Sequence, residues 1–165
     1  MPVDGYAVAV AEIAVRVEAA RKAGRPVAWI AHNNGAAAER FRPDSWGAEL
    51  SPELEPVANE PLFVKTVFGA FTGTELGSWL DANGATGIEL VGFLTHMCVS
   101  TTVRDALDFS YASTVVADAC ASRDLPGPNG VIPARTVHEA ELAALGDRFA
   151  GIFTAAQILG TPAAN

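Results

Sequence analysis

The chain has 165 residues, of which 50% are hydrophobic and only 18% are charged. This is the size of one ordinary domain with enough apolar material for a core, which excludes wholesale disorder. Eleven Lys and Arg residues against 19 Asp and Glu residues give a formal net charge of −8. Such an acidic chain without a basic cluster argues against a protein that binds nucleic acid or an anionic membrane surface.

The sequence also indicates where the protein works. No stretch reaches the roughly 20 apolar residues that span a bilayer, and residues 1–11 lack the basic start of a signal peptide. The two cysteines, Cys98 and Cys120, are too few for a disulfide framework. We therefore expect a single domain over residues 1–165 in the reducing environment of the cytoplasm.

Helical segments alternate with short apolar runs along the chain. In order, we predict a helix over 7–23, a strand over 27–31, a long polar loop over 33–59, a strand over 62–64, a helix over 74–83, a strand over 88–94, a helix over 99–109, a strand over 114–117, a loop over 123–133, a helix over 134–144 and a strand over 151–153. In the first helix, Ile13 and Val17 share the apolar face, whereas Arg16 falls elsewhere. The alternation indicates an α/β fold: a parallel, Rossmann-like sheet between two layers of helices.

Ligands of such a sheet bind beyond the carboxyl ends of its strands. Four polar positions follow strands directly: His32, Lys65, the turn over 95–98, and the segment over 118–120. These positions are the candidates for a functional site.

Cys98 lies between a predicted strand and the start of a helix. The positive end of the helix dipole favours a thiolate there, and backbone N–H groups at a helix start can hold an oxyanion. A free cysteine is also commonly a small buried apolar residue, so its position leaves both interpretations open. Cys120, which follows the next strand, fits core packing better.

Lys65 and the histidines allow several roles. A cation at Lys65 could favour the thiolate of Cys98, although a lysine at a strand end can also simply extend its stem to solvent. His96 is available for a Cys–His pair, but residues two apart on a tight turn need not face each other. His138 fits the surface of a helix, and His32 has no second histidine nearby, so no metal site is expected.

Two motifs carry a resemblance to a known family. Lys65 is followed by Phe71-Thr72-Gly73-Thr74-Glu75-Leu76, and the later turn reads Gly92-Phe93-Leu94-Thr95-His96-Met97-Cys98-Val99. The lysine together with the Gly-x-x-Thr-x-x-Cys-Val element is specific, whereas either alone would be weak. The sequence resembles the isochorismatase-like cysteine hydrolases, the superfamily that includes nicotinamidases and N-carbamoylsarcosine amidases, over residues 7–159.

The resemblance implies a fold and a mechanism. The family sheet has the strand order 3-2-1-4-5-6. Cys98 would be the nucleophile, Lys65 its supporting cation, and the backbone N–H groups of Thr95 and Cys98 the oxyanion hole. A cis peptide bond would join Leu94 to Thr95.

Substrate binding is assigned on weaker grounds. Phe68 and Trp46 could form an apolar lining for a small planar substrate, with His96 beside the nucleophile. The nicotinamidases carry an Asp-x-His plus His cluster where this chain reads Ala31-His32-Asn33-Asn34, which disfavours a metal-dependent member. We expect no metal and no cofactor.

One departure concerns the family's general base, an aspartate that ends a first strand ahead of the first helix. This chain starts almost at that helix, and Asp4 is the only acid before it. We therefore expect both the strand and the aspartate to be absent. Three explanations are open: a start codon assigned too late or a trimmed chain, a degenerate paralogous gene, or a strand donated by another chain. The first explanation is favoured because the other motifs are intact.

The expected function is hydrolysis of an amide, imide or similar C–N bond in a small molecule. The alternative is a chain that keeps the pocket and binds a small ligand or a partner without turnover. A redox-sensing thiol at Cys98 is a third, weaker hypothesis. We also expect a homo-oligomer, a dimer or larger, because half of this short chain is hydrophobic.

Overall fold

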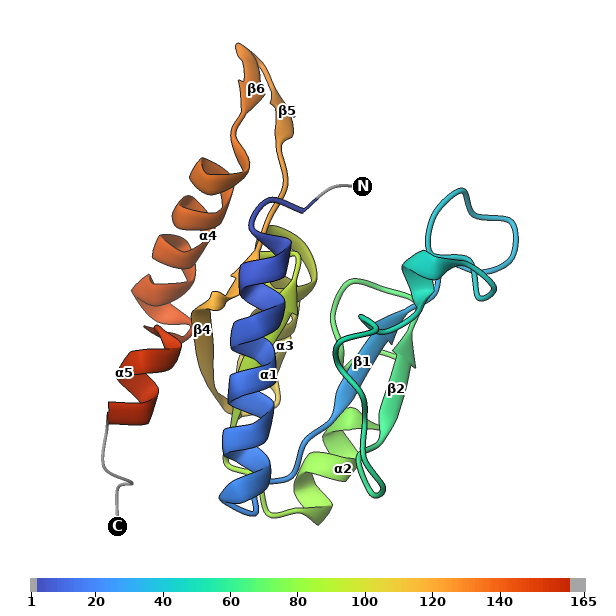
Figure 1. Cartoon of the computed structure of the whole chain (residues 1–165), viewed down its shortest axis with the longest axis vertical. Coiled ribbons are helices and arrows are strands. Elements are labelled where there is room, and N and C mark those ends of the chain that lie inside the picture. Colours follow the sequence, from blue (N-terminus) through green and yellow to red (C-terminus); the bar gives the residue numbers. More distant parts are fainter. Residues whose placement is uncertain (1–2, 161–165) are drawn as a thin grey trace.

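Parallel strands form the centre of the molecule in a computed structural model that describes residues 3–160, apart from the side chains at 46, 159 and 160 (Figure 1). The elements in chain order are α1 (Tyr6–Lys22), β1 (Trp29–His32), the short 3-10 helix η1 (Trp46–Ala48), β2 (Leu62–Lys65), α2 (Leu76–Ala82), β3 (Gly87–Phe93), the π-helical turn η2 (Thr95–Val99), α3 (Ser100–Asp108), β4 (Ala112–Ala121), β5 (Leu125–Gly127), β6 (Gly130–Ile132), α4 (Ala134–Arg148), β7 (Gly151–Phe153) and α5 (Ala155–Gly160). No helix within residues 3–160 is both long and apolar enough to cross a membrane.

The parallel strands form two groups. β1 pairs with β2, and β4 lies between β3 and β7 in a three-stranded sheet. These groups match the 3-2 and 4-5-6 parts of the expected strand order. Within residues 3–160 no strand pairs with both β1 and β3, so the position expected for strand 1 is not filled by this part of the chain.

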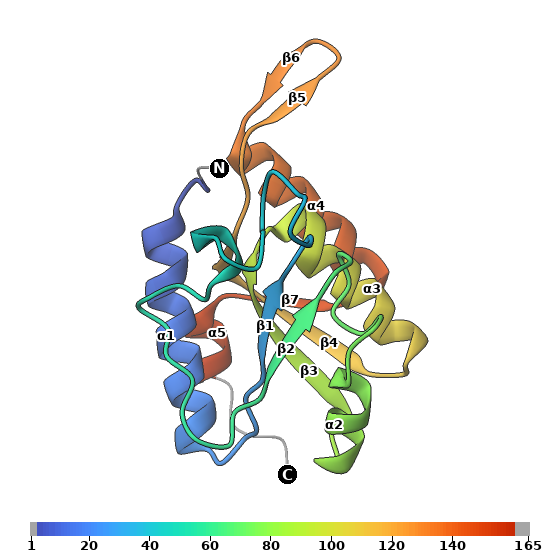
Figure 2. The ribbon, with the colours of Figure 1, turned by 90° about the vertical axis from the view of Figure 1, so that its right-hand side faces the viewer.

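Helices cover both faces of the strands, as predicted. Figure 2 shows α1 and α5 on one side of the strands and α2, α3 and α4 on the other. Successive residues of β4 point to opposite faces of the sheet. Val116 packs with α1 and α5, whereas Val115 packs with α3 and α4. Both valines are fully buried, because side chains alternate across a strand and each face of β4 is covered by helices.

The buried face of α1 includes a charged residue that periodicity placed elsewhere. Arg16 is only 3% exposed, and its Nε and Nη2 donate to the two carboxylate oxygens of Glu89 on β3 at 2.8 and 2.9 Å. Burial pushes the pKa of Glu89 upward, but hydrogen bonds from Arg16 and Arg25 outweigh it and leave this pKa below its usual value. A bidentate pair lets α1 bury an arginine against the sheet.

The hairpin β5–β6 and the helix α5 were not predicted from the sequence. The expected loop over 123–133 contains the antiparallel hairpin β5–β6, which projects away from the body of the molecule (Figures 1 and 2). The C-terminal segment forms the short helix α5. Three-residue strands and a six-residue helix are too short to give a clear hydrophobic period, so the prolines and glycines of 123–133 determined the prediction.

Glu60 ties the long segment between β1 and β2 to the body. Its carboxylate accepts hydrogen bonds from Arg21 of α1, from the indole Nε1 of Trp29 at 2.8 Å and from the backbone N–H of Val57. The guanidinium of Arg21, followed by the donors of Trp29 and Val57, lowers the pKa of Glu60 to about 2. One carboxylate thus fixes α1, β1 and the end of the long segment together.

We expect Glu60→Gln to lower the free energy of unfolding at pH 7 by about 2 kcal/mol, because hydrogen bonds to a charged group are lost. A carboxylate with a lowered pKa stabilises the folded chain above its ordinary pKa of 4.5, and this contribution disappears as the pH falls to about 2. The gap between wild type and variant should therefore close over that pH range.

Urea unfolding at several pH values measures this gap. Glu53→Gln, at an exposed position of the same segment, is the matched control and should match the wild type throughout. A gap for Glu60→Gln that stays constant down to pH 2 would contradict the assignment to Glu60.

Candidate active site

Cys98 lies in η2, the wide turn that joins β3 to α3. The ladder between β3 and β4 shifts register between Leu90 and Gly92, and Gly92 adopts a φ of 123°, which favours glycine. The cis peptide bond lies between Phe93 and Leu94, not between Leu94 and Thr95 as expected. The strand ladder ends at Phe93, so the chain changes direction at the bond after this residue.

The ammonium of Lys65 lies against this turn. Lys65 is only 4% exposed, and its Nζ lies 3.2 Å from Cys98 Sγ, 3.0 Å from the carbonyl oxygen of Val67 and 3.1 Å from His32 Nδ1. An ammonium has three N–H donors, so each donor has one acceptor. Of the three acceptors, only the sulfur can become an anion, and a buried cation is stabilised by an anionic partner. The arrangement therefore places a cationic hydrogen-bond donor against the sulfur of Cys98.

His32 brings a third functional side chain to the site. Its Nε2 lies 2.6 Å from Asn34 Oδ1, which can only accept a hydrogen bond. The hydrogen-bond network therefore assigns the proton to Nε2 and leaves Nδ1 as an acceptor for Lys65. The ring of Phe68 stacks on His32, and the ring of Phe41 meets it edge-on, with centroids 6.1 and 5.4 Å away.

The family model of the isochorismatase domain matches residues 2–157. The chain belongs to the isochorismatase family. The structure of an isochorismatase from Pseudomonas putida KT2440 superposes with a TM-score of 0.89 and is 39% identical, over 94% of this chain and 79% of that one.

Two curated relatives in this family carry names that describe an activity. Streptothricin hydrolase of Streptomyces noursei is 36% identical over 131 residues, which are 78% of this chain and 47% of that protein. The ureidoacrylate amidohydrolase RutB of Acinetobacter baylyi is 35% identical over 75 residues, which are 46% of this chain and 31% of that protein. The isochorismatase family is thus a family of hydrolases.

Two other predicted site residues of this isochorismatase domain differ in their contacts: Phe68 packs on His32, whereas His96 does not contact Lys65 or His32. Phe68 is 53% exposed and stacks on His32, which in turn contacts Lys65. His96 points to Ser122, whose Oγ lies 2.8 Å from its Nδ1, so the structure does not bring it together with Lys65. Burial, and then the charge of Arg123, lower the pKa of His96. The side chain of Trp46 lies outside the described residues.

The sequence analysis counted His32 among the candidate positions at strand ends but did not predict its contact with Lys65. The two residues are register partners at the ends of the paired strands β1 and β2. Equivalent positions at the carboxyl ends of neighbouring parallel strands were the signal that could have found this contact. Among residues 3–160, no cluster of three or more His, Cys, Asp or Glu side chains is arranged to hold a metal ion.

Helix α4 contacts both ends of the turn that carries Cys98. His138 Nδ1 lies 2.8 Å from Oγ1 of Thr95, which is completely buried, and Ser100 donates to Glu141 at 2.6 Å. Burial lowers the pKa of His138. The sequence placed His138 on the helix surface, whereas the structure uses it, with Glu141, to hold the two ends of the turn that carries Cys98.

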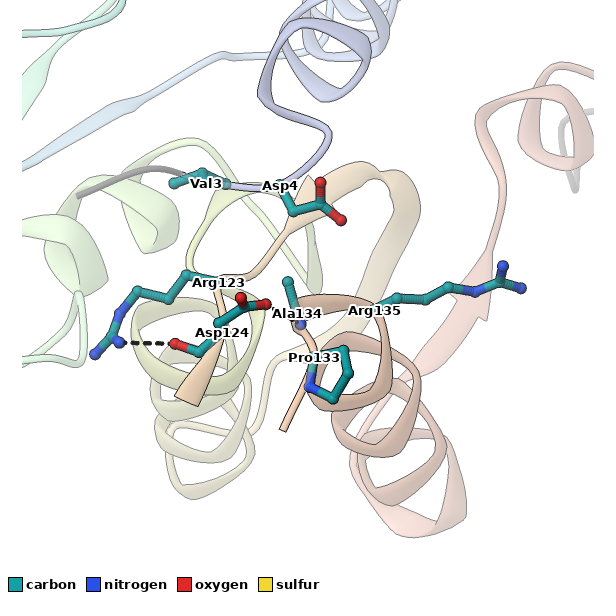
Figure 3. A pocket seen from close by; sticks show the side chains of 7 residues that line it. All are labelled: Val3, Asp4, Arg123, Asp124, Pro133, Ala134 and Arg135. Carbon is teal, nitrogen blue, oxygen red and sulfur yellow. Dashed lines mark hydrogen bonds between the residues drawn. The ribbon is translucent and has the colours of Figure 1, made fainter. Parts of the chain in front are cut away.

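Among residues 3–160, no carboxylate forms a hydrogen bond or an ion pair with Lys65 or Cys98. A cavity of about 490 Å³ does contain two carboxylates, Asp4 and Asp124, but it lies at the base of the β5–β6 hairpin (Figure 3). None of the residues that line this cavity is a partner of Cys98.

The loop after β2 is fixed to the helix that follows Cys98. Ala70 donates its N–H to Thr102 Oγ1 at 3.1 Å, and this hydroxyl donates to the carbonyl oxygen of Cys98 at 2.7 Å. Next to this link, Gly69 lies directly under Asp105: a Cβ at position 69 would be 1.8 Å from Asp105 Oδ2 and 2.9 Å from its Cγ. Burial, and then Asp108, raise the pKa of Asp105.

We expect Gly69→Ala to destabilise the protein by about 1–3 kcal/mol, because the new methyl group forces the loop and α3 apart. Thermal unfolding of Gly69→Ala, Asp105→Ala and the double variant forms a complete cycle. The alanine at 69 should cost much less in the Asp105→Ala background, where the overlapping atoms are gone. Equal costs in both backgrounds would refute the steric explanation.

Proposed function

We propose that this chain is a cysteine hydrolase that cleaves a C–N bond of the amide or imide type in a small molecule. The observation that carries the proposal is the buried ammonium of Lys65, 3.2 Å from Cys98 Sγ, with its other two donors on neutral acceptors. This geometry supports Cys98 as the nucleophile and Lys65 as its supporting cation. The resemblance to an amidohydrolase in the same family supports an amide-type substrate.

The proposed reaction has two stages. The thiolate of Cys98 attacks the carbonyl carbon, and the backbone N–H groups of Thr95 and Cys98 stabilise the oxyanion that forms. The C–N bond then breaks, the nitrogen leaves after taking a proton from water, and a thioester remains on Cys98. The hydroxide formed from this water attacks the thioester carbon, the carboxylic acid leaves, and the thiolate of Cys98 is restored. Both stages use the same oxyanion site, because each passes through a tetrahedral carbon.

The surroundings suit a small, flat substrate. His32, Phe41 and Phe68 present aromatic surface beside Lys65, and Phe68 is more than half exposed. Aromatic faces bind planar groups by stacking. We therefore propose that Phe68 contacts the substrate, and we retain Trp46 as a second candidate for this lining.

A second function is supported by a different observation. The isochorismatase-like mechanism needs a general base, yet within residues 3–160 no carboxylate contacts Lys65 or Cys98. A chain that holds a ligand beside Cys98 without turnover fits this arrangement. The two functions differ in whether products accumulate, so one assay separates them.

The test measures ammonia or amine release from a panel of small amides, imides and ureido compounds. We expect turnover by the wild type, a loss of at least about a thousandfold in Cys98→Ser, because the nucleophile is removed, and full activity in Cys120→Ser. Turnover by Cys98→Ser at the wild-type rate would refute the nucleophile. Saturable ligand binding without any product would instead establish the second function.

Thiol labelling gives a check that needs no substrate. Cys98 is partly exposed beside Lys65, whereas burial raises the pKa of Cys120 to about 12. Iodoacetamide at pH 7, followed by peptide mass spectrometry, should therefore label Cys98 and leave Cys120 unmodified. Equal labelling of the two cysteines in the folded protein would contradict the site.

A further inference from the structure

We infer that His32 and Asn34 are positioning residues that direct the ammonium of Lys65 onto Cys98. Three hydrogen bonds in series connect the exposed rim of the site to the nucleophile: from His32 Nε2 to Asn34 at 2.6 Å, from Lys65 to His32 Nδ1 at 3.1 Å, and from Lys65 to Cys98 Sγ at 3.2 Å. The inference rests on the proposed function for its chemical meaning, but its test reads thiol reactivity and not turnover.

The first residue of this series is itself held in place. The backbone N–H of Asn34 donates to the carbonyl oxygen of Phe41 at 2.8 Å, and its side-chain Nδ2 donates to the carbonyl oxygen of Arg40 at 3.2 Å. With Nδ2 occupied in this way, the remaining amide oxygen faces His32. Asn34 therefore offers an acceptor and not a donor to the imidazole.

This acceptor decides what His32 offers to Lys65. A neutral imidazole carries one N–H, and the oxygen of Asn34 draws it to Nε2. Nδ1 is then free to accept from the ammonium. In the other tautomer, an N–H at Nδ1 would point at the N–H groups of Lys65 and remove one of its three acceptors. The remaining ring contacts of His32, Phe41 and Phe68, are uncharged and leave this choice to Asn34.

The tautomer of His32 affects Cys98 because Lys65, which lies between them, is buried. At 4% exposure the ammonium cannot replace a lost acceptor with bulk water. A buried donor without a partner is costly, so without the Nδ1 acceptor Lys65 is no longer held in the geometry that places its Nζ against Cys98 Sγ. His32 thus acts on the sulfur through Lys65, without contacting the sulfur itself.

Two substitutions at position 32 separate this role from simple packing. His32→Asn keeps an acceptor near the position of Nδ1 but loses the ring, whereas His32→Phe keeps the ring contacts but loses the acceptor. We expect Cys98 of His32→Asn to react with iodoacetamide at pH 7 within about twofold of the wild type. Cys98 of His32→Phe should react about tenfold more slowly, the effect of one lost hydrogen bond to a charged group.

Packing alone predicts the reverse order, so the comparison is decisive. A wild-type rate in His32→Phe, or equal slowing in both variants, would overturn the inference. Near-ultraviolet circular dichroism and thermal unfolding show whether each variant is folded. A substrate assay tests the proposed function separately. If the wild type shows no turnover, the proposed function fails, but the comparison of Cys98 labelling rates still tests the role of His32.

A measurement on the unmodified protein covers the case in which a variant fails to fold. Nitrogen-15 NMR of the wild-type histidines distinguishes a protonated Nε2 from a protonated Nδ1. We expect Nε2 of His32 to carry the proton that Asn34 accepts, and Nδ1 to be the acceptor for Lys65. A proton on Nδ1 would overturn the inference directly, and Asn34→Ala should shift the equilibrium towards that form.

Discussion

The buried ammonium of Lys65 is the interaction on which the rest of the site depends. A cation with 4% exposure is tolerable only when each of its donors has an acceptor, and here a sulfur, a carbonyl oxygen and an imidazole nitrogen supply them. This requirement couples two strands and a turn, because His32 and Lys65 end β1 and β2 while Cys98 follows β3. The hydrogen-bond acceptors that the Lys65 ammonium requires therefore hold these two strands and the turn together.

The same principle recurs where helices meet the sheet. Arg16 of α1 is buried against Glu89 of β3, and Glu60 gathers donors from α1, β1 and the long segment. Helix α4 contacts the turn that carries Cys98 through His138 and Glu141, and not through apolar contacts alone. Apolar packing lets elements slide, whereas hydrogen bonds between charged or polar groups fix direction and register. Such ties locate Cys98 relative to Lys65.

Much of the fold and part of the site were predictable. Alternating helices and strands identified the α/β class, and the rule for the ends of parallel strands selected Lys65 and Cys98. The sequence did not show that His138 and Arg16 are buried partners, because Thr95 and Glu89 lie 43 and 73 residues away from them. Helical periodicity describes one element at a time and contains no information about a partner on another element.

Local pattern by itself determined the class of fold, and the motifs determined the family resemblance, which implies Cys98 as the nucleophile and Lys65 as its supporting cation. The tertiary structure alone decided the direction of each side chain. It turned His96 away to Ser122, brought His32 to Lys65, and formed a hairpin from residues whose composition predicted a loop. The physical reason is that hydrophobic periodicity is a property of neighbours in the chain, whereas hydrogen-bond partners are set by the packing of elements distant in sequence.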